Sequence, residues 1–171
     1  WPGEEYALLA CFQGEMWADF RTIDGESRLG AIAPTPGLWP QCPDSLRAAL
    51  VGARGLRLYL ATPAIFKKGW LPDFIDTNSL EGELCGFKLK LRAAAVPRWE
   101  AGTSWDMTQS KGGKGMRGAR RLVAAGAVYW FEMRDGQCPA ALADLWLTSI
   151  SVERAQDGFG LVLPGVWQPP A

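Results

Sequence analysis

The sequence of 171 residues contains no histidine. This absence removes the side chain that most often acts as a general base and most often binds a metal ion. Its cysteines, Cys11, Cys42, Cys85 and Cys138, lie far apart and form no Cys-x-x-Cys pair, so the sequence offers no zinc site. We expect a chain with reduced cysteines, no bound metal and no cofactor.

Groups that cooperate in catalysis are not brought together by the sequence pattern. The carboxylates are scattered without a spaced pair, and no serine has a histidine to activate it. The Gly113-Lys114 dipeptide lacks the rest of a phosphate-binding P-loop. We therefore predict that the chain is not an enzyme. It has no signal peptide or membrane-length apolar run, so we also expect a cytoplasmic protein without a membrane partner.

The chain has no net charge, because 18 Lys and Arg residues are matched by 18 Asp and Glu residues. A nucleic-acid-binding domain is often basic overall, so the total charge argues mildly against one. The distribution argues the other way. Cations are concentrated from Lys88 to Arg121, where only Glu100 and Asp106 oppose them. Such a segment can follow a phosphodiester backbone.

Hydrophobic periodicity predicts strands at 55–61 and 87–93, and aromatic and β-branched residues predict a strand at 127–133. A last short strand is predicted after a glycine loop. A helix is predicted at 139–150, and a further helix between the first two strands fits best at 76–84. This order predicts an α+β fold with a ferredoxin-like, RRM-like βαββαβ domain. The segment from residue 98 to residue 121 is expected to be a long loop or ribbon.

The first part of the chain has a different composition. Residues 6–12 are consistent with a buried strand, and the segment 31–44 is a proline-rich connector. A short helix is predicted at 45–51, with Asp44 or Ser45 as its N-cap. We predict the end of a first domain and its connector over residues 1–50, followed by the C-terminal ferredoxin-like domain over residues 51–171.

Four sequence blocks occur in an informative order. They are Gly25-Glu26-Ser27-Arg28-Leu29, LRLYLATPAIFKKGWLPDFID at 56–76, RLVAAGAVYWFE at 121–132 and DGFGLVLPGVW at 157–167. Together they resemble the RAMP-superfamily subunit of the Cmr, or type III-B CRISPR, effector complex that holds the 5′ handle of the guide RNA. In that family the first block follows a complete first domain. The resemblance therefore implies that this sequence is the C-terminal portion of such a subunit.

The basic strand and ribbon supply candidate RNA-binding residues. Composition alone favours a solvated outer face with a surface loop. The resemblance instead implies RNA contact, because the family's subunit grips RNA through two ferredoxin-like halves. The candidate cations are Lys88, Lys90, Arg92, Arg98, Lys111, Lys114, Arg117, Arg120 and Arg121. Trp99 and Trp105 are candidates for stacking on unpaired bases.

The glycine loop is a second candidate for RNA contact. Successive backbone N–H groups near Gly158, Phe159 and Gly160 could form an anion-binding concavity. The alternative is a tight turn into the last strand. RAMP proteins resemble one another in a C-terminal glycine-rich loop against the RNA-binding surface, so the resemblance implies RNA contact at these three residues.

An aromatic and cationic turn is the candidate site for a protein partner. It contains Phe66, Lys67, Lys68 and Trp70. A structural corner, in which Trp70 and Leu71 fill the core, is an equal alternative. RNA contact ranks below both.

The resemblance implies a non-catalytic crRNA-binding subunit in antiviral defence. This subunit would hold the 5′ handle, dock the large polymerase-like subunit and assemble with the backbone RAMP subunits. Three alternatives stay open: the equivalent subunit of the type III-A (Csm) complex, a metal-independent RAMP endoribonuclease, and a structural subunit that touches only protein. Processing endoribonucleases of this superfamily often use a histidine, which this sequence lacks.

Overall fold

The computed structural model divides the chain into two compact units, residues 1–41 and residues 42–171. In the first unit, strand β1 (Phe20–Thr22) pairs antiparallel with strand β2 (Leu29–Ala31). The strand predicted at 6–12 lies outside the described residues. The residues that the structure describes are 20–22, 29–31, 37, 39–105, 116–134, 136 and 138–170.

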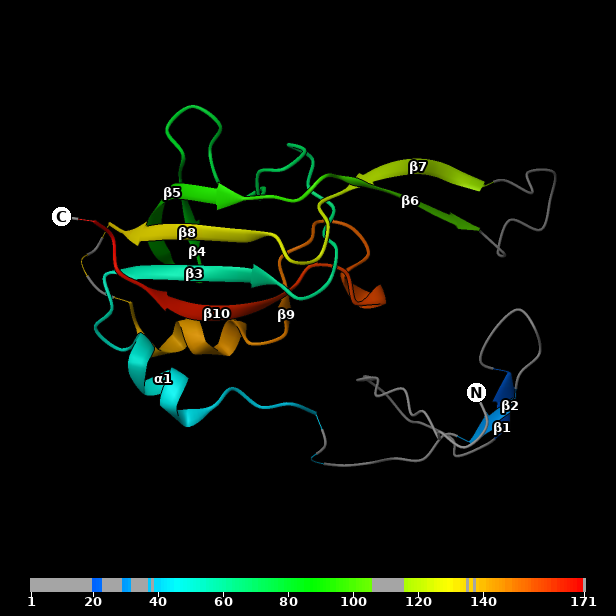
Figure 1. Ribbon diagram of the computed structural model, residues 1–171, viewed down its shortest axis with the longest axis horizontal. Helices are drawn as coiled ribbons and strands as arrows, with labels where there is room; N and C mark the ends of the chain where they lie inside the picture. Colours follow the sequence, from blue (N-terminus) through cyan, green and yellow to red (C-terminus); the bar gives the residue numbers. More distant parts are fainter. Residues whose placement is uncertain are drawn as a thin grey trace. The chain divides into compact units, whose positions relative to one another are not determined.

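A six-stranded sheet forms the centre of the second unit, and neighbouring strands in it are antiparallel. The strand order is β4-β5-β8-β3-β10-β9 (Figure 1). The strands are β3 (Gly55–Leu60), β4 (Glu81–Leu84), β5 (Phe87–Ala95), β8 (Val128–Met133), β9 (Thr148–Ser149) and β10 (Leu161–Trp167). Three short helical segments accompany the sheet: α1 (Asp44–Leu50), η1 (Ala140–Leu145) and η2 (Ala155–Asp157). The predicted α+β class is confirmed.

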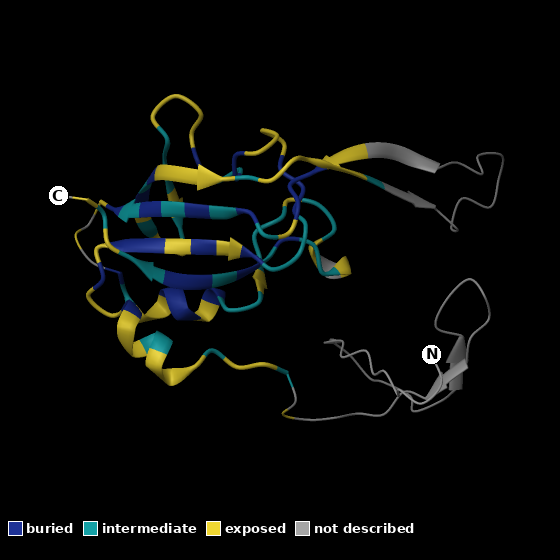
Figure 2. Cartoon of the chain, in the orientation of Figure 1, coloured by how far each residue is buried: buried dark blue, intermediate teal, exposed yellow. Residues whose placement is uncertain are grey.

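Strand β3 shows why the sheet has one covered face and one exposed face. Leu56, Leu58 and Leu60 are completely buried, whereas Arg57 and Tyr59 are exposed. Because successive side chains of a strand point to opposite faces, the leucines all face the core. The alternation is visible along β3 in Figure 2, and it confirms the strand predicted at 55–61.

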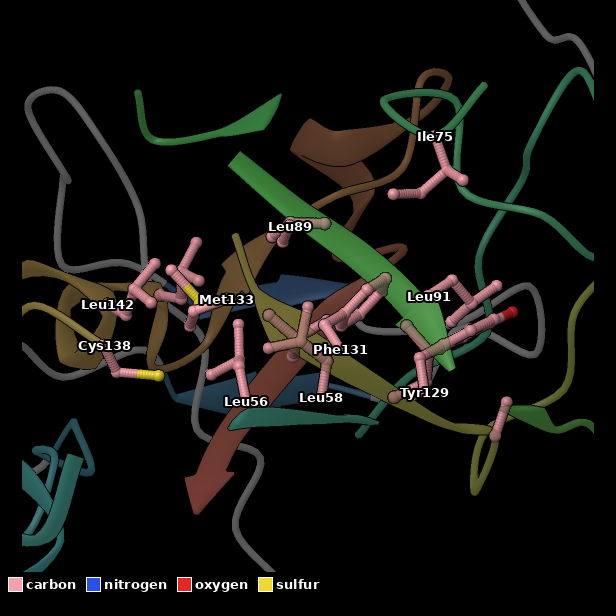
Figure 3. Packing of buried hydrophobic residues seen from close by; sticks show 14 of the residues in the cluster. Leu56, Leu58, Ile75, Leu89, Leu91, Tyr129, Phe131, Met133, Cys138 and Leu142 are labelled. Carbon is pink, nitrogen blue, oxygen red and sulfur yellow. The ribbon is translucent and has the colours of Figure 1, made fainter. Parts of the chain in front are cut away.

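The covered face packs against helical segments and against the chain that follows β3. Leu50 of α1, Leu142 of η1 and Ile75 are fully buried in the same cluster as the sheet leucines. Tyr129 and Phe131 of β8 lie at its centre (Figure 3). Each large apolar side chain buried in this way contributes roughly 1.5–3 kcal/mol.

The helix predicted at 76–84 is wrong. Asp76 Oδ1 accepts hydrogen bonds from the backbone N–H groups of Asn78 and Ser79 at 3.0 and 2.9 Å. These bonds, with the Ser79 hydroxyl, lower the pKa of the Asp76 carboxyl. Such a carboxylate can cap a helix or close a turn, and here it closes a turn. Leu80 then takes a left-handed φ of 56°, after which β4 pairs with β5.

The helix predicted at 139–150 is only partly formed. The helical segment is the 3-10 helix η1, which ends at Leu145. Leu147 has a left-handed φ of 55°, and β9 then pairs with the first residues of β10. This pairing requires an extended backbone, so the chain leaves the helical conformation well before Ile150.

Helix α1 confirms the short helix predicted at 45–51, but its N-terminus differs. No side chain caps the helix, so the predicted cap at Asp44 or Ser45 is wrong. Arg47 Nη1 donates a hydrogen bond to Asp144 Oδ1 at 2.9 Å, which joins α1 to η1. The compact unit thus includes a helix that precedes the predicted domain. The assignment of residues 1–50 to the end of a first domain stays a prediction.

A two-stranded hairpin extends from the sheet (Figure 1). Its strands, β6 (Glu100–Trp105) and β7 (Met116–Leu122), are antiparallel, so the predicted ribbon is present. Strand β5 leads into β6, and β7 leads into β8, the neighbour of β5 in the sheet. The backbones of Ala64 and Val123 exchange two hydrogen bonds of 2.9 Å, which fix the root of the hairpin beside the end of β3.

Candidate nucleic-acid interface

The cations of strand β5 lie opposite carboxylates. Lys90 Nζ is 3.7 Å from Glu81 Oε1, and the same oxygen lies 3.3 Å from Arg134 Nε. The register of β4 and β5 places Lys88 directly opposite Glu83. Partly exposed pairs of this kind stabilise a fold by about 1 kcal/mol at most. Their carboxylates also offset the attraction that the cations would exert on a phosphate backbone.

Arg92 is matched in the same way from an irregular position. The register of β5 against β8 shifts between Leu91 and Ala93, so Arg92 lies at a bulge. Its Nε donates a hydrogen bond to Glu132 Oε2 at 2.6 Å. The predicted alternation of β5 is therefore present, but Lys90 and Arg92 already have acidic partners. Their contact with RNA stays a prediction.

A sequence signal for this pairing was available. Cys85 and Gly86 have φ angles of 52° and 82° and form the two-residue turn between β4 and β5. A two-residue turn with two positive φ angles fixes the hairpin register. Two glutamates before such a turn must then face two lysines after it. A helix was predicted here instead, in which these glutamates and lysines would not pair.

The root of the β6–β7 hairpin brings a cation and a flat ring together. Arg121 Cζ lies 5.1 Å from the ring centroid of Trp99, whose exposed fraction is 52%. Arg98 is exposed beside them. Arg120 Nε is 3.7 Å from Glu153 Oε2. An arginine stacked on an exposed indole offers both a phosphate partner and a surface for an unpaired base.

The remaining hairpin candidates belong to its outer half. The register places Trp105 opposite Met116 at the end of the described strands, and Arg117 follows on β7. Lys111 and Lys114 lie outside the described residues. RNA contact by these residues stays a prediction from the resemblance.

The glycine loop uses its N–H groups within the chain. The N–H groups of Gly158, Phe159 and Gly160 donate to backbone carbonyls at 3.0, 3.3 and 2.7 Å. Gly158 and Gly160 have φ angles of 81° and 75°, which glycine adopts without strain. The predicted concavity of free N–H groups is therefore wrong, and the loop is a turn into β10. RNA contact through other atoms of these residues stays a prediction.

The side chains around this loop are also engaged with one another. Arg154 Nε lies 2.7 Å from Asp157 Oδ2, and its guanidinium lies 4.8 Å from the ring centroid of Phe159. The Thr62 hydroxyl donates to the Gly158 carbonyl at 2.7 Å. These contacts tie the loop to the segment after β3 and partly neutralise the carboxylate that would repel a phosphate.

Some residues of the aromatic turn are buried in the core, as expected for a structural corner, and others are exposed, as a partner site requires. Phe66 has an exposed fraction of 5% and meets the ring of Tyr129 edge-on at 6.5 Å, so its side chain belongs to the core, and its contact with a partner stays a prediction. Lys68 Nζ donates to two backbone carbonyls, at 3.2 and 2.5 Å, and thereby holds the turn together. Lys67 and Trp70 are exposed, and the exposed fraction of Trp70 is 48%. Lys68 is exposed as well, and partner contact by Lys67, Lys68 and Trp70 stays a prediction.

Trp70 borders a groove beside the edge of β5. Strand β4 pairs with β5 only from Phe87 to Lys90, so no strand among the described residues pairs with the later part of β5 on that side. The groove has a volume of about 390 Å³. Its lining residues are Trp70, Leu80, Leu91, Arg92, Ala93, Ala94 and Val96.

The exposed face of the central strands contains residues that the sequence analysis did not consider for binding. Arg57 and Tyr59 of β3 lie there, directly opposite Trp130 and Val128 of β8. Their alternation with buried leucines was used only to predict a strand. The same pattern also predicts that these polar and aromatic side chains share one solvent-facing surface.

Metal-ion sites and membrane-spanning helices are two further features to consider in the described part of the chain. Among those residues, no three His, Cys, Asp or Glu side chains are placed to hold a metal ion. None of the helices in the same residues is long and apolar enough to cross a membrane.

The family model of the CRISPR-associated protein Cmr3 matches residues 16–167. This match covers every strand and helix of the second unit. The chain belongs to the CRISPR-associated Cmr3 family. Its place is therefore in the type III-B Cmr effector complex, and the resemblance to a Cmr subunit seen in the sequence is confirmed. A comparison with curated proteins finds no match.

Proposed function

We propose that this Cmr3-family chain is a non-catalytic subunit that binds the 5′ handle of the crRNA. The exposed Trp99–Arg121 pair at the hairpin root carries this proposal. It combines a fixed cation with a π surface, and single-stranded RNA is bound by these two elements together. The match to the Cmr3 family supports the proposal, because a subunit of a CRISPR effector complex has a use for an RNA-binding surface.

We also propose that the second unit derives from the ferredoxin-like fold. Its four longest strands in the sheet lie in the order β5-β8-β3-β10, with antiparallel neighbours. A βαββαβ chain whose strands are β3, β5, β8 and β10 produces this order. The turn at Asp76 and strand β4 take the place of the first helix, and η1 takes the place of the second.

The contact with protein partners is proposed at Trp70. A large exposed indole beside an apolar groove is typical of an interface anchor. We propose that the large polymerase-like subunit docks here, while other surfaces meet the backbone RAMP subunits. The Trp70 carbonyl accepts a hydrogen bond from the Tyr129 hydroxyl at 2.6 Å, and that bond survives truncation of the side chain. Trp70→Ala should therefore reduce copurification of the large subunit and leave folding intact.

The RNA-binding proposal is tested by reversing charge along the hairpin. Replacing Lys111, Lys114, Arg117 and Arg121 with Glu should weaken binding of handle RNA. It should also reduce the log–log salt slope by about three, the value for four lost contacts to single-stranded phosphates. Fluorescence titrations at several salt concentrations measure both effects. Lys67→Glu, an exposed change outside the hairpin, is the control, and an unchanged slope in the hairpin variant would place RNA elsewhere.

The non-catalytic part of the proposal has its own test. The purified chain should leave labelled repeat RNA intact with and without Mg²⁺, because the sequence has no histidine to act as general base. Site-specific cuts that persist through further purification would instead favour a RAMP endoribonuclease.

A further inference from the structure

On the exposed face of the central sheet, large planar side chains lie next to very small residues of the neighbouring strands. In one row across the strands, Trp130 of β8 lies opposite Arg57 of β3, and Arg57 lies opposite Gly165 of β10. In the next row, Gly55 of β3 lies opposite Trp167 of β10. The other neighbour of Trp130 is an alanine of β5. Each large group therefore has a small neighbour on an adjacent strand.

The glycines on this face leave space for flat side chains to lie on the sheet. A Cβ atom at Gly55 would lie 2.6 Å from Cε3 of Trp167, which is closer than two carbon atoms approach without bonding. A Cβ atom at Gly165 would lie 2.9 Å from Nη2 of Arg57. Neither glycine has a positive φ, so neither is required by its own backbone conformation. Glycine is needed at these positions because the Trp167 indole lies over Gly55 and the Arg57 guanidinium lies over Gly165.

The flat groups on this face are also free to take a new partner. Among the described residues, Arg57 forms no ion pair, and neither the Tyr59 hydroxyl nor the Trp130 indole N–H forms a hydrogen bond. The exposed fraction of Tyr59 is 41%. Tyrosine and tryptophan with an unused polar tip are typical of binding surfaces. The unpaired guanidinium complements a polyanion, whereas the carboxylates on the neighbouring strands are already matched by cations.

This face is continuous with the candidate RNA interface. The last open-face row contains Ala95 of β5, Val128 of β8 and Tyr59 of β3. Strand β5 runs from that row through Trp99 into the hairpin, and the hairpin returns to the start of β8. The hairpin extends from the end of the sheet at which β3 ends (Figure 1), and Tyr59 is the second-to-last residue of β3.

We propose that the open face of β8, β3 and β10 is a stacking platform for unpaired bases of the RNA, with Arg57 binding a phosphate. Bases stack on Trp130 and Tyr59, and Trp167 extends the surface across β10. Stacking on aromatic side chains is tolerant of base identity, so this platform binds the strand without reading its sequence. The inference rests on the proposed function, since it names a second contact surface for the same RNA.

The test separates stacking from charge on the platform. Tyr59→Leu and Trp130→Leu keep an apolar side chain but remove the π surface, and each should weaken single-stranded RNA binding about 5- to 150-fold with an unchanged salt slope. Arg57→Gln should instead reduce the log–log slope by about 0.7. Tyr59→Phe retains the ring and should bind like the unchanged chain. Trp70→Leu removes an exposed indole outside the platform and serves as the matched control.

Each outcome decides between the two proposals. RNA carrying 2-aminopurine should lose fluorescence when bound, and Tyr59→Leu should restore part of it because a stacked base is quenched. If the unchanged chain binds RNA and responds to hairpin charge reversal, but the platform variants bind normally, the platform is wrong and the proposed function stands. If the platform variants lose only their association with protein subunits, the face is a protein interface. If the unchanged chain binds no RNA, both proposals fail. Should Trp130→Leu melt early, Tyr59→Leu, at an exposed position, still decides the matter.

Discussion

The edge and the centre of the same sheet face use charge differently. At the edge, Glu81 lies near both Lys90 and Arg134, so cations and carboxylates are interleaved on β4 and β5. At the centre, Arg57 lies flat over Gly165 and has no ion pair among the described residues. The edge looks cationic in the sequence and is balanced in the structure.

The difference shows that cations along one strand are a poor measure of its attraction for phosphate. The residue opposite each cation on the neighbouring strand decides how much of its charge is available. A single unmatched arginine beside aromatic rings is better suited to bind RNA than a row of matched lysines.

The largest change in the free energy of unfolding is expected at the centre of the sheet, where Gly55 leaves room for the Trp167 indole. Gly55→Val would place atoms against the indole and the carbonyl of Trp167, and should lower the free energy of unfolding by about 1–3 kcal/mol. Ala94→Val, at an exposed position of β5 on the other face of the sheet, should change it by less than about 0.5 kcal/mol. Urea unfolding of both variants measures the difference. Equal stability in the two variants would mean that the indole does not lie on Gly55.

A smaller effect, on RNA binding, is expected when a carboxylate at the edge of the sheet is removed so that its cations become unmatched, like Arg57 at the centre. Glu81→Gln leaves Lys90 and Arg134 without this carboxylate, so RNA binding at low salt should strengthen. The log–log salt slope should steepen by up to about 1.4, corresponding to two further phosphate contacts. Because these pairs are partly exposed, the free energy of unfolding should change by less than about 1 kcal/mol. Asp144→Asn, which breaks the Arg47 pair elsewhere, is the control; the same slope in both variants would refute the balancing role of Glu81.

The smallest effect concerns the thiols on either side of the sheet. Cys138 is buried, and burial raises the pKa of its thiol to about 11, whereas Cys85 is exposed in the turn between the edge strands. A thiol reagent at pH 8 should modify Cys85 rapidly and Cys138 only after unfolding, as mass spectrometry would show. The folded chain keeps a proton on Cys138 that the unfolded chain releases near its ordinary pKa of 9.0. Stability should thus decline as pH rises from about 9 to about 11, and Cys138→Ala should lack this decline.

Local pattern alone determined the longer central strands of the sheet. In β3 and β5, apolar and polar residues alternate, and a strand is the conformation that puts all the apolar ones on one side. In β8, aromatic and β-branched residues favour a strand. The blocks at 56–76, 121–132 and 157–167 also determined the family, because motif order is a property of the sequence itself.

Prediction from the local sequence failed where the same residues are compatible with both a helix and a turn or strand. The oxygen of Asp76 that would cap a helix closes a turn instead, because the chain must return to pair β4 with β5. The helix predicted at 139–150 ends in a segment that contains Thr148 and Ser149, and pairing with β10 makes these two residues strand β9. In both cases the backbone hydrogen bonds of a neighbouring strand outweigh weak helical periodicity.

The candidate site depended most on the tertiary structure. The sequence determined which cations and aromatic residues the chain has, and it placed several of them correctly on β5 and on the hairpin. Strand pairing decided which of those charges are matched, because cross-strand partners such as Lys90 and Glu81 meet only once the register is fixed. It also placed Gly55 beneath Trp167, more than a hundred residues later in the chain. No local pattern contains that contact, since it exists only after β3 and β10 have paired.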